Sequence, residues 1–365
     1  MSDTDGRGGP ESLDLALSRR QLVTRAAAAA ATLGAGSTLL APAAQAARRR
    51  VGRSLTDVTV LNILAPQLGY AAEYVADLNG YFKAKGLNVN VQTTRGSAPS
   101  IQALIQGQGM LTSIGSMEMC LHNANEGTPL VSIAVREHRA PVALVSSNKN
   151  PITKPQDLAG KKIGIPSAGG TSELTLNTVL KKYNIPISSV PRQVTGFAPG
   201  TFDLIRAGRI DGFIIGATQM GQFQQLIPES VFLQFGKYVL DSYGYISTVP
   251  LIQQNRLTMR SYLEAVRQSM FWIMDDKKKN NYANTLKLLR AHYDFQELQD
   301  DKVATSWLDY LVGGWLYQGQ RYILKPEVKR LVRIYNQLVD IGGAKPGFNP
   351  IKWVNTTVAV YPKTK

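Results

Sequence analysis

The segment from Asp157 to Ser172, DLAGKKIGIPSAGGTS, holds the residues best suited to ligand chemistry. It reads as a charged turn, a short apolar strand, a glycine turn and a helix that begins at Thr171 or Ser172. Such a helix start presents backbone N–H groups, and its dipole also favours negative charge. The segment is therefore either an anion-binding helix start or an ordinary strand-to-helix turn. It is not a nucleotide phosphate loop, because Gly160-Lys161 precedes the strand instead of following it.

The composition excludes several other classes of site. The chain has 365 residues, 44% of them hydrophobic and 18% charged, which is ordinary for a globular protein of about two domains. A single cysteine, Cys120, excludes an intrachain disulfide and a multi-cysteine metal site. The three histidines have no metal-ligand spacing, so we expect no metal and no cofactor.

The net charge of +15 favours an anionic ligand or an anionic surface as partner. The basic runs Arg48–Arg50 and Lys277–Lys279 lack the interleaved aromatic residues of a nucleic-acid platform. We therefore expect a small anion and no nucleic acid.

The first 46 residues read as an export signal that is not part of the fold. Arg19 and Arg20 form a twin-arginine start, and an alanine-rich run follows from Ala26 to Leu40. The run ends in an A-x-A cleavage pattern at Ala44–Ala46. A membrane anchor is the alternative, but the run is short and contains two glycines. We expect cleavage near Ala46 and a product in the periplasm or outside the cell.

Strand patterns alternate with helical patterns through the middle of the chain, which predicts an α/β fold with mostly parallel sheets. The predicted strands are 58–64, 87–91, 112–114, 130–135, 142–145, 163–165, 190–194 and 213–215. Beyond Arg256 the pattern is almost wholly helical as far as Gly342.

An internal echo indicates two lobes of the same design. Residues 101–108 and 113–116 correspond to residues 202–209 and 214–217 at a constant offset of 101. Each copy is a helix that ends in glycine, a short link, and a strand that runs into glycine. Two such lobes would hold a ligand between them, near the carboxyl ends of their strands.

Three segments resemble a known family. They are Tyr74–Leu87, similar to "A-x-x-x-G-Y-F-x-x-x-G-L", Ile152–Pro166, similar to "I-x-x-x-x-D-L-x-G-K-K-I-G-V", and Leu204–Gly212, similar to "A-L-x-x-G-x-I-D-A". The chain thus resembles the solute-binding proteins of bacterial ABC importers for nitrate, aliphatic sulfonates, taurine and thiamine-pyrimidine precursors. One departure is Met110, which stands where the second lobe has Asp211.

The resemblance implies a type II periplasmic-binding-protein fold with a helical C-terminal region. Lobe one would comprise residues 58–145 and 245–365, and lobe two residues 146–244. Crossing strands near 140–147 and 239–246 would form the hinge. The implied protein is a monomer that closes on one solute and delivers it to the membrane permease of an ABC importer.

Residues at the tips of strands are the candidates for lining the cleft. They are Gln67, Tyr70, Gly96, Ser97, Ser116 and Arg136 in lobe one, and Gly170, Thr171, Ser172, Thr218 and Tyr243 in lobe two or its return crossing. Most of them offer neutral hydrogen-bond donors, which suit a sulfonate, a carboxylate or nitrate. Arg136 is the candidate counter-charge, and Tyr70 either faces an organic ligand or packs inward. An aliphatic sulfonate is our first expectation for the ligand.

The sequence is also compatible with two other functions. A ligand-sensing subunit of a membrane receptor would have the same sequence features. An exported enzyme is the other alternative, since twin-arginine export often serves folded cofactor proteins. Against an enzyme stand the single cysteine and the absence of Gly-x-Gly-x-x-Gly and Gly-x-Ser-x-Gly patterns.

Overall fold

The computed structural model describes residues 54–64, 66–94, 96–140, 142–316 and 322–358. The predicted export signal and its cleavage site lie outside these ranges. Residues from Ser54 onward belong to one compact unit. Within the described residues, no helix combines the length and the apolar character needed to cross a membrane.

The first sheet contains five strands in the order β2-β1-β3-β10-β4. Their bounds are β1 Thr56–Asn62, β2 Leu87–Thr93, β3 Leu111–Gly115, β4 Leu130–Glu137 and β10 Tyr243–Thr248. β1 pairs in parallel with β2 and β3, whereas β10 runs antiparallel to both of its neighbours. Both faces of β1 are buried at alternate residues, Val58 and Val60 on one side and Leu61 on the other, as expected for a strand between two helical layers.

The second sheet repeats this plan in the order β7-β6-β8-β5-β9. Its strands are β5 Val142–Ser147, β6 Ile163–Ile165, β7 Arg192–Val194, β8 Gly212–Gly216 and β9 Ser230–Gln234. β6 pairs in parallel with β7 and β8, and β5 runs antiparallel to β8 and β9. The 101-residue echo therefore corresponds to equivalent strands, β3 and β8, at the centres of the two sheets. We call the part of the chain built around each sheet a lobe.

The predicted lobe boundaries are wrong by a few residues. The prediction assigns Val142–Val145 to lobe one, but β5 pairs entirely within the second sheet. It assigns Tyr243 and Gly244 to lobe two, but β10 pairs with the first sheet from Tyr243 onward. An apolar run carries no information about which distant strand it pairs with, so sequence pattern alone cannot place such a border.

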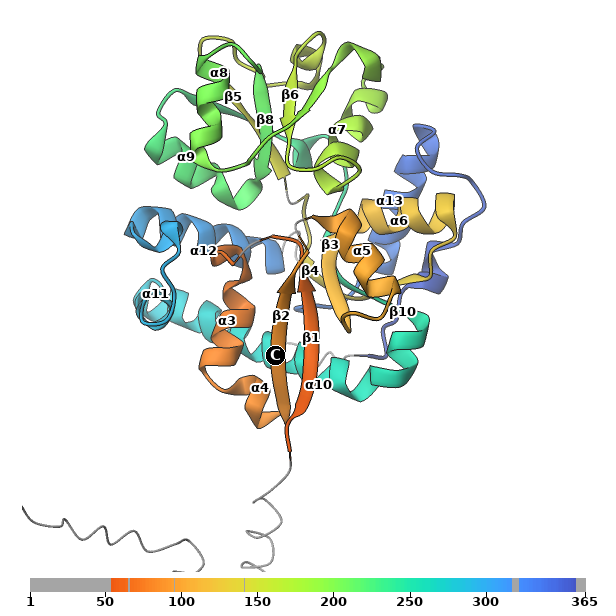
Figure 1. Ribbon diagram of the computed structural model, residues 1–365, viewed down its shortest axis with the longest axis vertical. Helices are drawn as coiled ribbons and strands as arrows, with labels where there is room; N and C mark the ends of the chain where they lie inside the picture. Colours follow the sequence, from red (N-terminus) through yellow and green to blue (C-terminus); the bar gives the residue numbers. More distant parts are fainter. Residues whose placement is uncertain (1–53, 65, 95, 141, 317–321, 359–365) are drawn as a thin grey trace, which may run out of the picture. The chain divides into compact units, whose positions relative to one another are not determined.

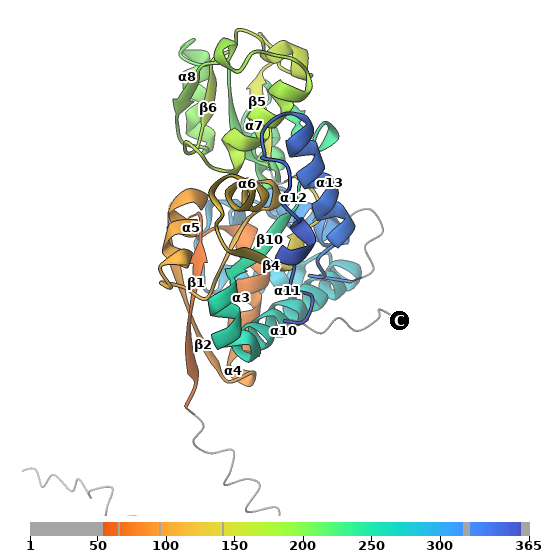
Figure 2. The ribbon, with the colours of Figure 1, turned by 90° about the vertical axis from the view of Figure 1, so that its right-hand side faces the viewer.

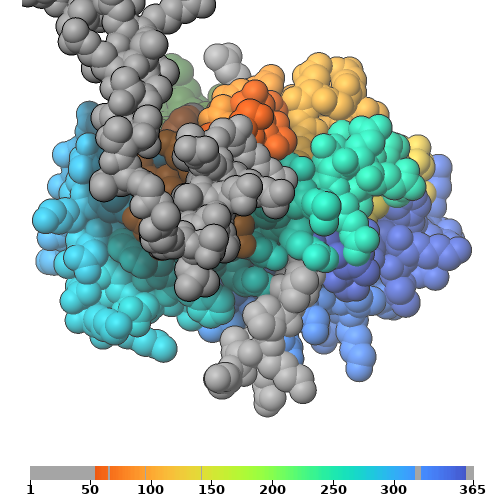
Figure 3. Space-filling model, turned by 90° about the horizontal axis from the view of Figure 1, so that it is seen from below, coloured from red at the N-terminus to blue at the C-terminus, as the bar shows by residue number. Residues whose placement is uncertain are grey.

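Helices cover both faces of the first sheet (Figure 1). One face is covered by α3 Ala71–Leu78, α4 Tyr81–Ala84, α10 Val249–Asn280, α11 Ala283–Arg290 and α12 Asp301–Trp315. The other is covered by α5 Ser97–Ile105, α6 Ser116–Glu126 and α13 Val328–Asp340. α6 and α13 lie side by side (Figure 2). The surface seen in Figure 3 includes the long helix α10, coloured teal.

The second sheet is also covered on both faces. α7 Thr171–Lys182 packs on the face that contains Ile163 and Ile214. α8 Asp203–Arg206 and α9 Met220–Leu226 lie with Phe202, Phe213 and Phe223 on the other face. Two sheets flanked by helices, with a helical C-terminal region, confirm the predicted fold class.

Asp211 binds the Gly-Lys-Lys segment, residues 160–162. This segment leads into β6 at the end of the strand that is farther from α7. Asp211 Oδ2 accepts a hydrogen bond of 2.8 Å from the backbone N–H of Lys162, and its Oδ1 accepts one of 2.9 Å from Asn150. The Asp211 N–H donates in return to the Lys162 carbonyl. Lys161 reaches both Asn150 and Asp211. This motif therefore fastens β6 to β8.

Asp211→Ala should lower the free energy of unfolding by about 1–2 kcal/mol, because Lys162 and Asn150 both lose their acceptor. Asp203→Ala is the matched control, since this carboxylate is exposed and pairs only with Arg206 on the same short helix in the described structure. Urea denaturation of both variants measures the difference. Equal midpoints for the two variants would contradict the role given to Asp211.

Candidate functional site

A cavity of about 390 Å³ lies where strand ends of the two sheets meet. The carboxyl ends of β1, β2, β6, β7 and β8 lead directly into its wall, and β4 ends there at Arg136 and Glu137. The antiparallel strands β5 and β10 begin there, at Val142 and Tyr243. The crevice beyond the carboxyl ends of parallel strands is the usual ligand position in open α/β sheets, and the volume suits a small molecule.

Nine of the eleven predicted residues line this cavity. They are Gln67, Tyr70, Gly96, Ser97, Arg136, Thr171, Ser172, Thr218 and Tyr243. The structure therefore brings together residues that are up to 176 positions apart in the chain, from Gln67 to Tyr243.

Two predicted residues do not line the cavity. Ser116 is buried, and its hydroxyl lies 2.7 Å from the hydroxyl of Ser242. It is the first residue of α6, so its side chain turns toward the start of β10. Gly170 is the N-cap of α7 and faces Ser167 and Ser97, where an added Cβ would lie 2.8 and 3.1 Å from their hydroxyl oxygens. Gly170 therefore allows Ser97 and Ser167 to pack closely against the start of α7.

Eleven other lining residues were not predicted from the sequence. They are Ile63, Leu64, Gly69, Glu137, Val142, Pro166, Ser167, Phe197, Gly216, Gln219 and Leu311. Most of them follow a strand by one to three residues. The strand-end rule, which selects residues just after a strand, would have included Leu64, Ser167 and Phe197 if it had been applied to every strand. Leu311 lies in the middle of α12 and has no local sequence signal.

The helix start at Thr171 is already engaged by the chain itself. The backbone N–H of Thr171 donates to Ser97 Oγ at 3.4 Å, and the Thr171 hydroxyl donates to Glu118 at 2.5 Å. Glu173 lies in the first turn, where its carboxylate complements the helix dipole and accepts from Gly169 N–H. The anion-binding capacity expected of this turn is therefore shared with protein groups.

Arg136 is held in place by neighbours on all sides. Its guanidinium donates to the Gly69 carbonyl, and its Nε lies 3.8 Å from Glu73 Oε1. The rings of Tyr70 and Tyr243 lie 4.9 and 5.9 Å from its central carbon, within the range of cation–π attraction. Arg136 therefore fixes the two tyrosine rings that form part of the cavity wall.

The charge of Arg136 is balanced by buried carboxylates. Burial lowers the pKa of Arg136, but the charges of Glu73 and Glu137 outweigh it, so the pKa is raised and the guanidinium stays charged. Burial also raises the pKa of Glu137, against the opposing effect of Arg136 and Arg139. An anionic ligand would meet a cation that already has partners.

The aromatic wall of the cavity stays neutral. Burial raises the pKa of Tyr70 to about 12 and raises that of Tyr243 well above its ordinary value. The Tyr70 hydroxyl accepts a hydrogen bond from Leu64 N–H at 3.3 Å, and its ring meets Tyr74 edge-on. With Phe197 on the second lobe, these rings offer flat apolar surface to a ligand.

Replacing Arg136 by methionine should cost about 3–5 kcal/mol of stability, because Glu73 and Glu137 would remain buried without their cation. Adding Glu73→Gln to Arg136→Met should recover part of that loss. Denaturant unfolding of the single and double variants measures both effects. The control is Arg206→Met, whose guanidinium is exposed and pairs with Asp203 and Glu229. An Arg136→Met variant as stable as this control would show that the buried carboxylates do not depend on Arg136.

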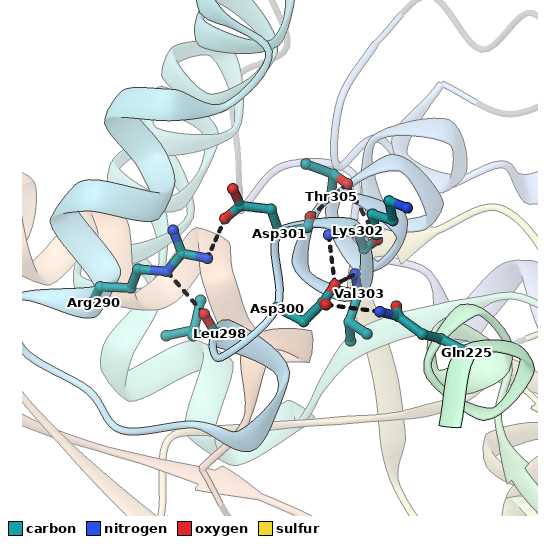
Figure 4. A network of polar contacts seen from close by, with 8 residues as sticks. All are labelled: Gln225, Arg290, Leu298, Asp300, Asp301, Lys302, Val303 and Thr305. Atoms are coloured by element: carbon teal, nitrogen blue, oxygen red, sulfur yellow. Dashed lines mark hydrogen bonds and ion pairs between the residues drawn. The ribbon is translucent and has the colours of Figure 1, made fainter. Parts of the chain in front are cut away.

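A second, more open cavity of about 930 Å³ lies at the start of α12. Several of its polar residues are hydrogen-bonded within the chain (Figure 4). Asp300 caps α12 by accepting from the N–H groups of Lys302 and Val303, and its other oxygen accepts from Gln225 at 2.7 Å. Arg290 donates to Asp301 at 2.6 Å. Across the described residues, no group of three His, Cys, Asp or Glu side chains is placed to hold a metal ion.

Comparisons with known proteins agree with this architecture. The model of the family described as NMT1/THI5 like matches residues 67–279. A curated relative is the riboflavin-binding protein RibY of Chloroflexus aurantiacus, 27% identical over 177 residues, which are 48% of this chain and 49% of the relative. The match therefore spans about half the length of that relative.

Solved structures with the same fold include two ligand-binding proteins. The alkanesulfonate-binding protein SsuA of Xanthomonas axonopodis pv. citri, bound to MOPS, has a TM-score of 0.59 at 13% identity, over 83% of this chain and 99% of its own. The nitrate-binding protein NrtA of Synechocystis PCC 6803 has a TM-score of 0.62 at 13% identity, over 83% and 87%. At a TM-score of 0.51 and 12% identity, over 82% and 97%, the desulfurization enzyme DSZB also shares the fold. Likeness at these identities shows the periplasmic-binding-protein fold.

Proposed function

The chain belongs to the NMT1/THI5-like family, and on that premise we propose that it is a receptor that binds one small organic solute between its two lobes. The observation that supports this most is the cavity of about 390 Å³, because its wall comes from strand ends of both sheets. A ligand in such a cavity makes contacts with both lobes at once. Ligand binding favours a closed arrangement through the contacts that only that arrangement provides.

The first candidate solute is an organic anion such as an aliphatic or aromatic sulfonate. Arg136 supplies a fixed positive charge, and Ser172 and Thr218 supply hydroxyls. Nitrate suits the cavity less well, since its four atoms would leave most of the volume and the aromatic wall without contacts. The body of the ligand should therefore be apolar or flat.

A neutral heteroaromatic solute, such as a flavin or a pyrimidine, is the second candidate. Three observations favour it: the rings of Tyr70, Phe197 and Tyr243 on the wall, the pairing of Arg136 with Glu73, and the similarity to a riboflavin-binding protein. Aromatic rings stacked on such a ligand contribute about 0.5–1.5 kcal/mol each beyond burial of area.

The wider role we propose is delivery of the solute to the permease of an ABC importer, by a monomer exported through the twin-arginine route. A sensor subunit would use the same cavity, and the fold shared with a desulfurization enzyme keeps catalysis as the alternative. Turnover separates the binding roles from catalysis, because a receptor or a sensor releases its solute unchanged, whereas an enzyme does not.

A panel of sulfonates, carboxylates, nitrate, pyrimidines and riboflavin, screened by thermal shift, should contain one class that raises the melting temperature. A ligand at 100 times its Kd stabilises the folded state by about 2.7 kcal/mol through mass action. Calorimetry should then give a stoichiometry of one, and chromatography should recover the ligand intact. Recovery of a converted product would overturn the receptor proposal.

Tyr70→Leu should weaken binding of the solute by about tenfold, since the stacking surface is lost while an apolar side chain remains. Tyr183→Leu is the matched control, because Tyr183 packs against Tyr238 in lobe two and does not line the cavity. Titration calorimetry measures both variants. If they bind equally well, Tyr70 is not part of the solute site.

A further inference from the structure

A buried hydrogen bond joins the two lobes beside the cavity. Thr171, the first residue of α7 in lobe two, donates its hydroxyl to Glu118 Oε2 of α6 in lobe one at 2.5 Å. The contact leaves little free space, since a Cβ on Gly115 would lie 2.7 Å from the Thr171 methyl group. Glu118 has no solvent exposure. The bond can exist only while the lobes are together.

Glu118 lies in a setting that disfavours its charge. Its Oε1 is buried without a hydrogen-bond partner, and the same is true of Asp241 Oδ2 close by. Among the described residues no ion pair of Glu118 is found. The titratable groups on the elements around it are His122 on α6, Glu173 and Lys181 on α7, Glu137 on β4, Asp241 and Tyr243 at the start of β10, and Arg330 on α13.

The three basic groups among them form contacts with other residues. His122 lies 2.8 Å from Glu126, and Lys181 donates to the Gly342 carbonyl. Arg330 donates to the backbone carbonyl of Asp241. A charged Glu118 would thus be a buried carboxylate with hydroxyl donors as its hydrogen-bond partners. Burying a charge in that way is costly, whereas a protonated carboxyl group avoids the cost.

We propose that closing the lobes takes up a proton on Glu118, which makes Glu118 a proton-dependent latch through Thr171. When the lobes separate, Thr171 leaves and the first turn of α6 gains access to water, where Glu118 ionises and releases the proton. The latch rests on the proposed function in one respect, since closure then becomes coupled to solute binding. Because of this coupling, the pH of the medium sets how tightly the solute is bound.

The direction of the effect follows from the closed structure. Burial raises the pKa of Glu118 above its ordinary value, and the hydrogen bonds from Thr171 and Ser97 offset only part of that rise. The closed form therefore binds more protons than the open form. Closure is favoured below the ordinary pKa of a glutamate and is weakened as the pH rises through the closed-state pKa. A single proton changes the closing equilibrium by at most about tenfold per pH unit.

Distances between the lobes test this without any ligand. Spin labels placed at Lys149 of lobe two and Lys352 of lobe one, both exposed, report the distance by pulsed EPR. In the wild type the population with the lobes in contact should grow as the pH falls. Glu118→Gln, which resembles the neutral acid, should keep that population high at every pH. Thr171→Val should reduce it at every pH.

The control is Glu126→Gln, which removes an exposed carboxylate from the same helix and should leave the wild-type pH dependence unchanged. A Glu118→Gln variant with the wild-type pH dependence would overturn the latch and point to another titrating group. A wild type without pH dependence would overturn it as well.

The same variants then separate the latch from the receptor proposal. With a solute from the panel, the Kd of the wild type should rise with pH, and the Kd of Glu118→Gln should not. If a solute binds with a Kd that is independent of pH, the latch is wrong and the receptor proposal stands. If no solute binds but the distances follow the predicted pattern, the receptor proposal fails and the latch stands.

Discussion

The rest of this structure depends on how β5 and β10 pair within their sheets. These are the strands that the chain forms directly after it crosses from one lobe to the other. β5 lies between β8 and β9, and β10 lies between β3 and β4, so each is an interior strand of its sheet. Every residue of both strands is buried. The chain must therefore pass between the lobes at two fixed points. Because the first residue of each strand, Val142 and Tyr243, also lines the cavity, the hinge and the candidate site share their backbone.

The same geometry explains why the cavity is aromatic and nearly neutral. Arg136 is the penultimate residue of β4, close to Tyr243, and its guanidinium needs partners because it is buried. Glu73 on α3 and the rings of Tyr70 and Tyr243 provide them. Such a cluster holds its rings in one position, which reduces the entropy lost when a flat ligand binds. Specificity then depends on shape and stacking more than on net charge.

Much of this fold could be predicted from sequence, because strand and helix periodicities are local. The glycine-marked echo correctly pointed to equivalent strands in the two sheets, and the strand-end rule found residues such as Tyr70, Thr171 and Thr218. What could not be predicted are non-local facts. The assignment of β5 to the second sheet depends on its pairing with β8. The contribution of Leu311 depends on where α12 packs, and the pairing of Arg136 with Glu73 joins residues 63 positions apart.

The contacts between the lobes differ in strength for a physical reason. On one side, Gln225 of α9 donates to Asp300 at the start of α12, in a contact exposed to solvent (Figure 4). Water competes for both groups there, so the bond contributes little to holding the lobes. On the other side, the Thr171–Glu118 bond is buried, and Glu118 has no exposure to solvent while the lobes are together. A buried bond whose acceptor is titratable is the contact that can both hold the closed arrangement and respond to a change in the medium.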